Sequence, residues 1–269
     1  MFGLLRNRRR RRILARNTIA DDVWNEAVAD LPVLAGLDDS TLARLRDLTL
    51  LFVEEKQIVG AGGLELEPYM RARIGALASL LVLELGFDWY DHIVTIIVYP
   101  DEFVVRDREV VDDAGVVHIG DDVLSGEAWD QGPVVLAWTD IEASGQGDGY
   151  NVVAHEFAHK LDLLSGAVDG MPPLHRGMNA ERWSATFQAA YDGLHFALDR
   201  GEETWLDPYA AEEPAEFFAV CTELFFDTPD ELADRYPAVY SELSAFFKQS
   251  PAETLRRSAA RPNPLNSSS

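Results

Sequence analysis

Two histidines and a glutamate lie within the five consecutive residues His155-Glu-Phe-Ala-His159, in the pattern H-E-x-x-H. Residues 150–164 around them are predicted to form a helix, and side chains four positions apart share one face of a helix. Both imidazoles can therefore bind one ion, and Zn²⁺ accepts neutral imidazole nitrogen without a strong geometric demand. Glu156 points away from the axis joining the histidines. It can reach a water bound to the metal and act as general base, as in zinc hydrolases.

The alternative interpretation is a surface helix that carries two histidines and an ordinary acid. The composition of the helix argues against it, because most of its remaining side chains are apolar: Val152, Val153, Phe157, Ala158 and Leu161. Histidines and a carboxylate on a helix that is largely buried need partners. The metal interpretation supplies those partners and is favoured.

A catalytic zinc ion takes three protein ligands and keeps its fourth position for water. The best candidate for the third ligand is Glu216, which lies in a predicted helix, residues 214–226, that is otherwise apolar. A buried carboxylate needs a cation, which zinc would supply. An ion pair with an arginine is the alternative. Glu223, two turns farther along the same helix, is a candidate to support the ligands from outside.

The other candidates for the third ligand have better explanations. Glu212 and Glu213 precede the helix and are the acids that its positive end favours. Each remaining histidine is expected to be structural or solvated rather than a ligand. These histidines are His92, His118, His175 and His195.

The charge of the chain is strongly negative but unevenly distributed. The 269 residues carry a net charge of −23. Seven of the 23 basic residues lie within residues 1–16, which contain no acid, so residues 17–269 hold 16 basic and 46 acidic residues and carry −30. Such a body repels nucleic-acid phosphates, and no direct nucleic-acid binding is expected. The arginine run could bind an anionic lipid surface or nucleic acid, but we expect a disordered end or one that folds back on the acidic body.

The expected cellular location follows from the segments and disulfides that the sequence does not provide. The longest apolar stretch, residues 74–83, is too short for a transmembrane segment, and the first five residues are too short for the apolar core of a signal peptide. Cys221 is the only cysteine, so no internal disulfide is possible, and we expect it to fill the core. These features favour a cytoplasmic protein.

The site residues need a scaffold, and the pattern along the chain predicts an α/β, helix-rich fold with a small mixed sheet. We expect a basic end over residues 1–16, one domain over 17–249 and a disordered tail over 250–269. Within the domain, residues 17–90 are predicted to be mainly helical and 91–249 to form the catalytic part. The predicted helices are 68–85, 150–164, 181–199, 214–226 and 238–248, and the predicted strands are 93–99, 103–106 and 134–138. The strand at 134–138 could border the cleft and pair with an extended peptide, or could be an ordinary buried strand.

Several blocks of sequence in the same order resemble the Mlc titration factor A family of bacterial zinc metallopeptidases. They are LELGFDW at 83–89, YPDEFVV at 99–105, QGPVVLAW at 131–138, NVVAHEFAHKLD at 151–162 and PAEFFAV at 214–220. The resemblance covers most of residues 20–250 and implies a zincin-like peptidase domain related to the catalytic domain of anthrax lethal factor. The arginine-rich start is a departure from the family pattern.

The resemblance implies one Zn²⁺ per chain, held by His155, His159 and Glu216, with Glu156 as base. It also implies that Tyr209 stabilises the transition state. The expected function is hydrolysis of peptide or protein substrates, of the aminopeptidase kind. The alternative is a regulatory protein that sequesters an Mlc-like transcriptional repressor, with the zinc site secondary.

Overall fold

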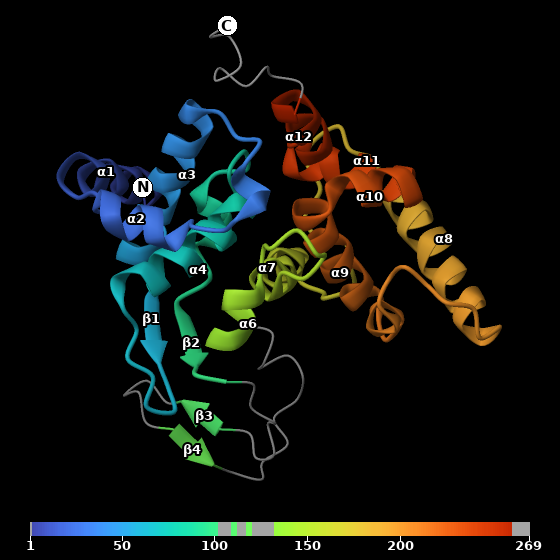
Figure 1. The fold of residues 1–269 in the computed structure, drawn as a ribbon, viewed down its shortest axis with the longest axis horizontal. Helices are drawn as coiled ribbons and strands as arrows, with labels where there is room; N and C mark the ends of the chain where they lie inside the picture. The colour runs from blue at the N-terminus through green and yellow to red at the C-terminus, as the bar shows by residue number, and fades with distance from the viewer. Residues whose placement is uncertain (1, 102–108, 112–116, 120–131, 260–269) are drawn as a thin grey trace, which may run out of the picture.

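The computed structural model describes residues 2–101, 109–111, 117–119 and 132–259 (Figure 1). The predicted strand at 103–106 lies outside the described residues. Helices of the first part are α1 (Phe2–Arg16), α2 (Asp21–Ala27), α3 (Asp39–Glu55) and α4 (Pro68–Leu81). Helices of the second part are α6 (Trp138–Ala143), α7 (Val152–Asp162), α8 (Ala180–Asp199), α9 (Pro214–Asp227), α10 (Pro229–Arg235), α11 (Pro237–Phe247) and α12 (Pro251–Ala259). Short 3₁₀ turns lie at η1 (Pro32–Leu34), η2 (Phe87–Tyr90), η3 (Leu163–Ser165) and η4 (Pro208–Ala211).

The sheet is small and lies beneath the helices in Figure 1. Its three strands are β1 (Gln57–Gly60), β2 (Thr95–Tyr99) and β5 (Val134–Ala137), in the order β1-β2-β5. Both pairings are parallel, with Gln57 opposite Thr95 and Ile96 opposite Val134. Antiparallel pairing occurs separately, between β3 (Glu109–Val111) and β4 (Val117–Ile119). The helix-rich α/β class is therefore confirmed, although the described three-stranded sheet is parallel rather than mixed.

Helix α4 is the central helix of the first part, because nearly every residue from Ala72 onward is buried. It packs against α3 on one side and against α7 on another. The approach to α3 is close: a Cβ added at Gly75 would lie 3.1 Å from Cγ2 of Thr49 and 3.2 Å from the ring of Phe52. Glycine at this position therefore sets how near the two helices come.

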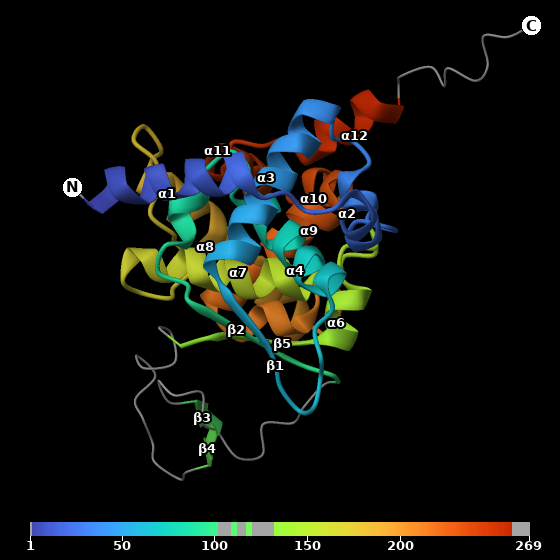
Figure 2. The same ribbon diagram turned by 90° about the vertical axis from the view of Figure 1, so that its left-hand side faces the viewer.

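Helix α7, which carries the H-E-x-x-H motif, lies between the two parts of the molecule. It contacts α4 and the sheet on one side and α9 on the other (Figures 1 and 2). Its apolar residues Val153, Phe157 and Leu161 are fully buried. The predicted burial of the motif helix is thus confirmed, and α7 and α9 face each other across the candidate site.

The two ends of the chain differ from the sequence prediction. Residues 2–16 form α1 instead of a disordered segment, because Arg10 is buried against acids far along the chain. At the other end, α12 begins at Pro251, and Ala252 is buried with its backbone N–H donating to the Tyr240 hydroxyl at 3.1 Å. The prediction of a disordered tail is wrong for the helical residues of α12. Neither helix could be predicted from the composition of its segment, because the contacts that hold each one are made with residues distant in the sequence.

Among the described residues, no helix has both the length and the apolar character that crossing a bilayer requires. The predicted helix at 181–199 matches α8, in whose apolar stripe Trp183, Phe187 and Leu194 are buried and Tyr191 is partly buried. Cys221 is fully buried, as predicted.

Candidate metal centre

The loop before α7 is fixed in place by α9. The carboxylate of Asp227, at the end of α9, accepts the backbone N–H groups of Gly147 at 3.1 Å and Gly149 at 2.5 Å. Asn151 then caps α7, its side-chain oxygen accepting the N–H of Ala154 at 3.0 Å. The first turn of the motif helix is therefore held in a defined position relative to α9.

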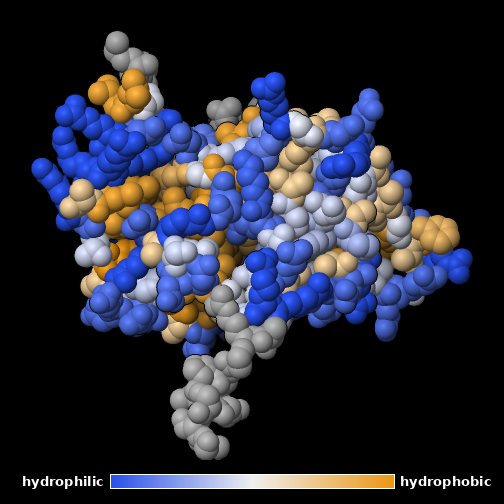
Figure 3. Space-filling view, turned by 90° about the horizontal axis from the view of Figure 1, so that it is seen from above, coloured by the Kyte–Doolittle hydropathy of each residue, from blue (hydrophilic) through white to orange (hydrophobic). Residues whose placement is uncertain are grey.

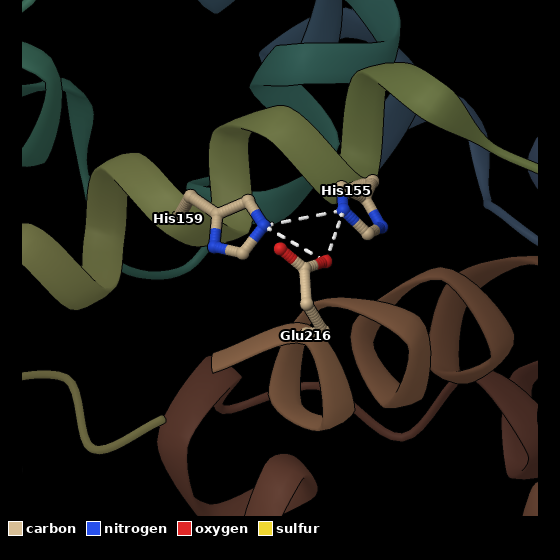
Figure 4. A group of neighbouring side chains, drawn as sticks. All are labelled: His155, His159 and Glu216. Atoms are coloured by element: carbon tan, nitrogen blue, oxygen red, sulfur yellow. Dashed lines mark hydrogen bonds and ion pairs between the residues drawn. The ribbon is translucent and has the colours of Figure 1, made fainter. Parts of the chain in front are cut away.

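Helix α9 presents Glu216 to the motif helix. Pro214 opens this helix, with its fixed φ suited to the first helical position. Glu216 lies in the first turn and points toward α7, where His155 and His159 point back at it (Figure 4). The rest of α9 is almost wholly buried, so the position of Glu216 is set by core packing.

Three ligand atoms converge at this point. Nε2 of His155 lies 3.0 Å from Oε2 of Glu216, Nε2 of His159 lies 3.4 Å from the same oxygen, and the two Nε2 atoms are 3.2 Å apart (Figure 4). A tetrahedral zinc ion with bonds of about 2.0–2.1 Å separates its ligand atoms by about 3.4 Å. The triangle of these atoms therefore has the size and the nitrogen and oxygen donors that zinc requires. They form the one candidate metal-binding group among the described residues.

The charges of the cluster match that role. Burial alone would lower the pKa of His155, but its contacts with Glu216 and Glu223 outweigh burial and raise that pKa to about 10. Burial alone would raise the pKa of Glu216, yet its contacts with His155 and His159 hold that pKa well below the usual range. The negative charge of Glu216 and Glu223 beside the two imidazoles would equally favour a bound cation.

Glu223 supports the cluster from behind. Its Oε1 lies 2.7 Å from Nδ1 of His155, on the side of the ring away from Glu216. Its Oε2 accepts the backbone N–H of Asn151 at 2.9 Å. A carboxylate in this position fixes the tautomer that leaves Nε2 free to bind a metal. The expectation that Glu223 acts from outside the ligand set agrees with this geometry.

The loop after α7 closes onto the start of α9. The carboxylate of Asp162 is fully buried, and its Oδ2 accepts the backbone N–H of Gly170 at 2.7 Å. Gly170 has φ of +81°, and a Cβ there would lie 2.6 Å from the carbonyl oxygen of Pro214. Only glycine allows this approach, which holds the end of the motif helix close to the turn that carries Glu216.

Two further predicted residues lie beside the cluster. Glu156 is half-buried on the next position of α7, and burial is the main cause that raises its pKa. Tyr209, in η4, has its ring centroid 6.0 Å from that of His155 and is 44% exposed. Burial, followed by the negative charge of Glu216, raises the pKa of Tyr209 well above its ordinary value. The phenol therefore keeps its proton and can donate it in a hydrogen bond.

The remaining candidates lie elsewhere. Glu212 and Glu213 are exposed ahead of α9, and His92 is exposed. His175 has Nε2 2.8 Å from the carbonyl oxygen of Phe246 and stacks on its ring, which is a structural contact. His195 packs edge-on against Tyr191 on α8. The side chain of His118 lies outside the described residues.

Sequence comparisons identify relatives of this chain. Residues 5–248 match the family model described as glucose-regulated metallo-peptidase M90. Proteins named Mlc titration factor A are similar over most of their length. That of Klebsiella pneumoniae (strain 342) is 41% identical over 239 residues, covering 88% of this chain and 89% of the relative. That of Serratia proteamaculans (strain 568) is 42% identical over 237 residues, covering 87% and 89%.

The name of this family, metallo-peptidase, implies a bound metal. Among the described residues, one group of side chains could bind it. The match spans α1 to the end of α11, so it includes both helices of the candidate centre. The chain belongs to the M90 family of glucose-regulated metallo-peptidases.

Proposed function

We propose that this protein is a zinc-dependent peptidase. The observation that carries the proposal is the convergence of His155, His159 and Glu216 on one point, with Glu156 beside them on the motif helix. A purely structural zinc site needs ligands but no base, and it is commonly closed by a fourth protein ligand. Here the described residues offer three ligands and an adjacent carboxylate, which is the composition of a hydrolytic centre.

Each residue has a distinct role in this proposal. The ion would be held by His155, His159 and Glu216. It would lower the pKa of a water molecule bound at its fourth coordination position. Glu156 takes a proton from the attacking water and returns it to the leaving amine, and its raised pKa makes it a better base for the first transfer. Tyr209, which keeps its own proton, donates a hydrogen bond to the oxyanion as the tetrahedral intermediate forms.

The sheet offers a place for an extended substrate. Strand β5 is an edge of the described three-stranded sheet and packs against α7. A peptide added alongside it would gain backbone hydrogen bonds and pass close to the motif helix. Aminopeptidase-like action on peptide or protein substrates is the finer form of the proposal, and it rests on the family resemblance. A cytoplasmic location is likewise part of the proposal and is supported by the single, buried cysteine.

A second candidate function is regulatory. The relatives carry the name Mlc titration factor A, which favours binding of an Mlc-like repressor by this chain as well. In that case the metal centre would be secondary. Glu156 favours the enzyme, because sequestration of a partner needs no general base.

The deciding experiment combines metal analysis with a peptide-library cleavage assay on the purified chain. We expect about one zinc per chain and cleavage that a chelator abolishes and zinc restores. Glu156→Gln should keep zinc but lose activity by on the order of 10²–10⁴-fold. Glu213→Gln removes an equal charge from an exposed position near α9 and is the matched control. Zinc-free protein that added zinc does not restore would exclude the metal centre, and wild-type activity in Glu156→Gln would exclude its role as base.

A further inference from the structure

Helix α1 is docked on the body through one of its faces. The guanidinium of Arg10, 8% exposed, lies 2.8 Å from Oε2 of Glu55 and 2.7 Å from Oδ1 of Asp91, and it also pairs with Asp88. The same group sits 4.7 Å above the ring centroid of Phe87. Ion pairs, hydrogen bonds and a cation–π contact thus meet at one buried side chain, which fixes how α1 is turned.

Arg6 and Ile13 extend this inner face. Nη1 of Arg6 lies 2.7 Å from Oδ2 of Asp91, and Ile13 packs against the hydrophobic core. These positions are three or four residues from Arg10, as one face of a helix requires. Part of the arginine run does therefore fold back on the acidic body.

The opposite face of α1 points to solvent and is basic. Its five exposed arginines have no ion pair with any described acid: Arg8, Arg9, Arg11, Arg12 and Arg16. Because the inner face is fixed by Arg10, these charges cannot turn inward to be neutralised. The body, at −30, therefore carries a concentrated positive surface along one helix.

The first turn of α1 adds exposed apolar side chains to this surface. Leu4 is 79% exposed and Leu5 is 62% exposed. Figure 2 shows the N-terminal end of α1 projecting past the neighbouring helices, and Figure 3 shows hydrophilic side chains gathered at this edge of the molecule with an apolar group at its tip. Two leucines without a cover, next to arginines, are costly in water unless a partner buries them.

We propose that the outer face of α1 docks on an anionic lipid membrane. Arginines attract the acidic headgroups, and the two leucines enter the interface between headgroups and acyl chains. A nucleic acid would use the arginines alone and leave the two exposed leucines in water. None of the candidate metal ligands lies on α1, so this surface is separate from the hydrolytic centre.

The test is co-sedimentation of the full chain with vesicles. One set contains phosphatidylglycerol and phosphatidylcholine mixed about one to two, and the other contains phosphatidylcholine alone. The first variant carries Arg8→Gln, Arg9→Gln, Arg11→Gln and Arg12→Gln, and the second carries Leu4→Ser and Leu5→Ser. The matched control removes four exposed arginines elsewhere, through Arg176→Gln, Arg200→Gln, Arg235→Gln and Arg257→Gln.

We expect the chain to bind the anionic vesicles only, more weakly as salt rises. The four-arginine variant should lose affinity by on the order of 10³-fold, since each cation near such a surface contributes about 1 kcal/mol to binding, and the control should keep its affinity. The leucine variant should also bind more weakly. The inference is overturned if the chain ignores anionic vesicles at low salt, or if the control loses as much affinity as the first variant. Tighter binding to a short DNA duplex, or arginine-dependent dimers in light scattering, would assign the surface to nucleic acid or to a second copy instead.

Discussion

Nδ1 of His155 and Oε1 of Glu223 lie 2.7 Å apart, and this contact joins the motif helix to the helix that carries Glu216. The other oxygen of Glu223 accepts the N–H of Asn151, the cap residue of α7. One carboxylate therefore orients a candidate metal ligand and holds the start of its helix. Such an outer contact fixes the orientation and the tautomer of the histidine that binds the metal.

The first prediction concerns that carboxylate. Glu223→Gln should lower zinc affinity by about 10–100-fold, because the amide cannot stabilise the ring of His155 as a carboxylate does. Competition with a calibrated zinc chelator measures the change. Glu212→Gln, at an exposed position before α9, is the control and should bind zinc like the wild type. Unchanged affinity in Glu223→Gln would mean that the contact shapes the fold and not the metal site.

The second prediction separates binding from turnover at Tyr209. Tyr209→Phe removes the hydroxyl and keeps the ring, so zinc content should stay near one per chain. The value of kcat should fall by about 10²–10³-fold, as it does when one oxyanion donor is lost, with a smaller change in KM. Glu216→Ala is the contrasting variant and should lose both zinc and activity. Loss of zinc in Tyr209→Phe would place the tyrosine in the support of the cluster and not in the reaction.

The grouping of the three candidate ligands was largely predictable, because each of them stands out among its own neighbours in the sequence. His155 and His159 are one helical turn apart, and Glu216 stands out as an acid in an apolar run. What could not be predicted depends on partners distant in sequence. Arg10 looked solvated because its acids lie 45, 78 and 81 residues away. Strand β1 was missed because it is short, ends in Gly60 and buries only Ile58.

Similar limits explain the other differences in the fold. Helix α6 is absent from the predicted helices, because it follows β5 without a turn and its residues after Trp138 are mostly polar. Helix α12 is rich in charge and has little apolar sequence, and its packing rests on Ala252 and on the hydroxyl of Tyr240. The division into one domain over 17–249 with separate ends remains a prediction.

The third prediction concerns pH and Asp162. Burial is the main cause that raises the pKa of this carboxyl from 3.8 to about 6. Between these values the folded protein binds more protons than the unfolded chain, so the wild type loses stability as pH rises through this window. Asp162→Asn does not titrate. Its free energy of unfolding relative to wild type should therefore rise between about pH 4 and 6, by up to about 3 kcal/mol, and then level off.

Urea unfolding of both proteins at several pH values measures this difference. Zinc is removed first, because a cation at His159 would itself lower the pKa of Asp162. Asp199→Asn, at the exposed end of α8, is the control for a change of charge alone. A constant difference between Asp162→Asn and wild type across the window would show that Asp162 is ionised throughout.

The last prediction concerns the docking of α1. Arg10→Gln leaves Glu55, Asp88 and Asp91 facing one another without their shared cation. Removing one partner of a buried ion pair is costly, about 3–5 kcal/mol where the rest must stay buried. Because α1 packs mainly against α3 alone, it can instead detach and let the three acids become hydrated. We therefore expect α1 to lose amide hydrogen-exchange protection while α4, α7 and α9 keep theirs.

Arg9→Gln is the matched control, since Arg9 is the exposed neighbour on the same helix and has no ion pair with any described residue. Its exchange pattern should equal that of the wild type, because exposed substitutions change stability by less than about 0.5 kcal/mol. Peptide cleavage should persist in both variants, since the candidate ligands lie on α7 and α9. Protection of α1 that survives Arg10→Gln would mean that Arg6 and Ile13 suffice to dock the helix, and loss of protection throughout would mean that α1 is part of the global folding unit.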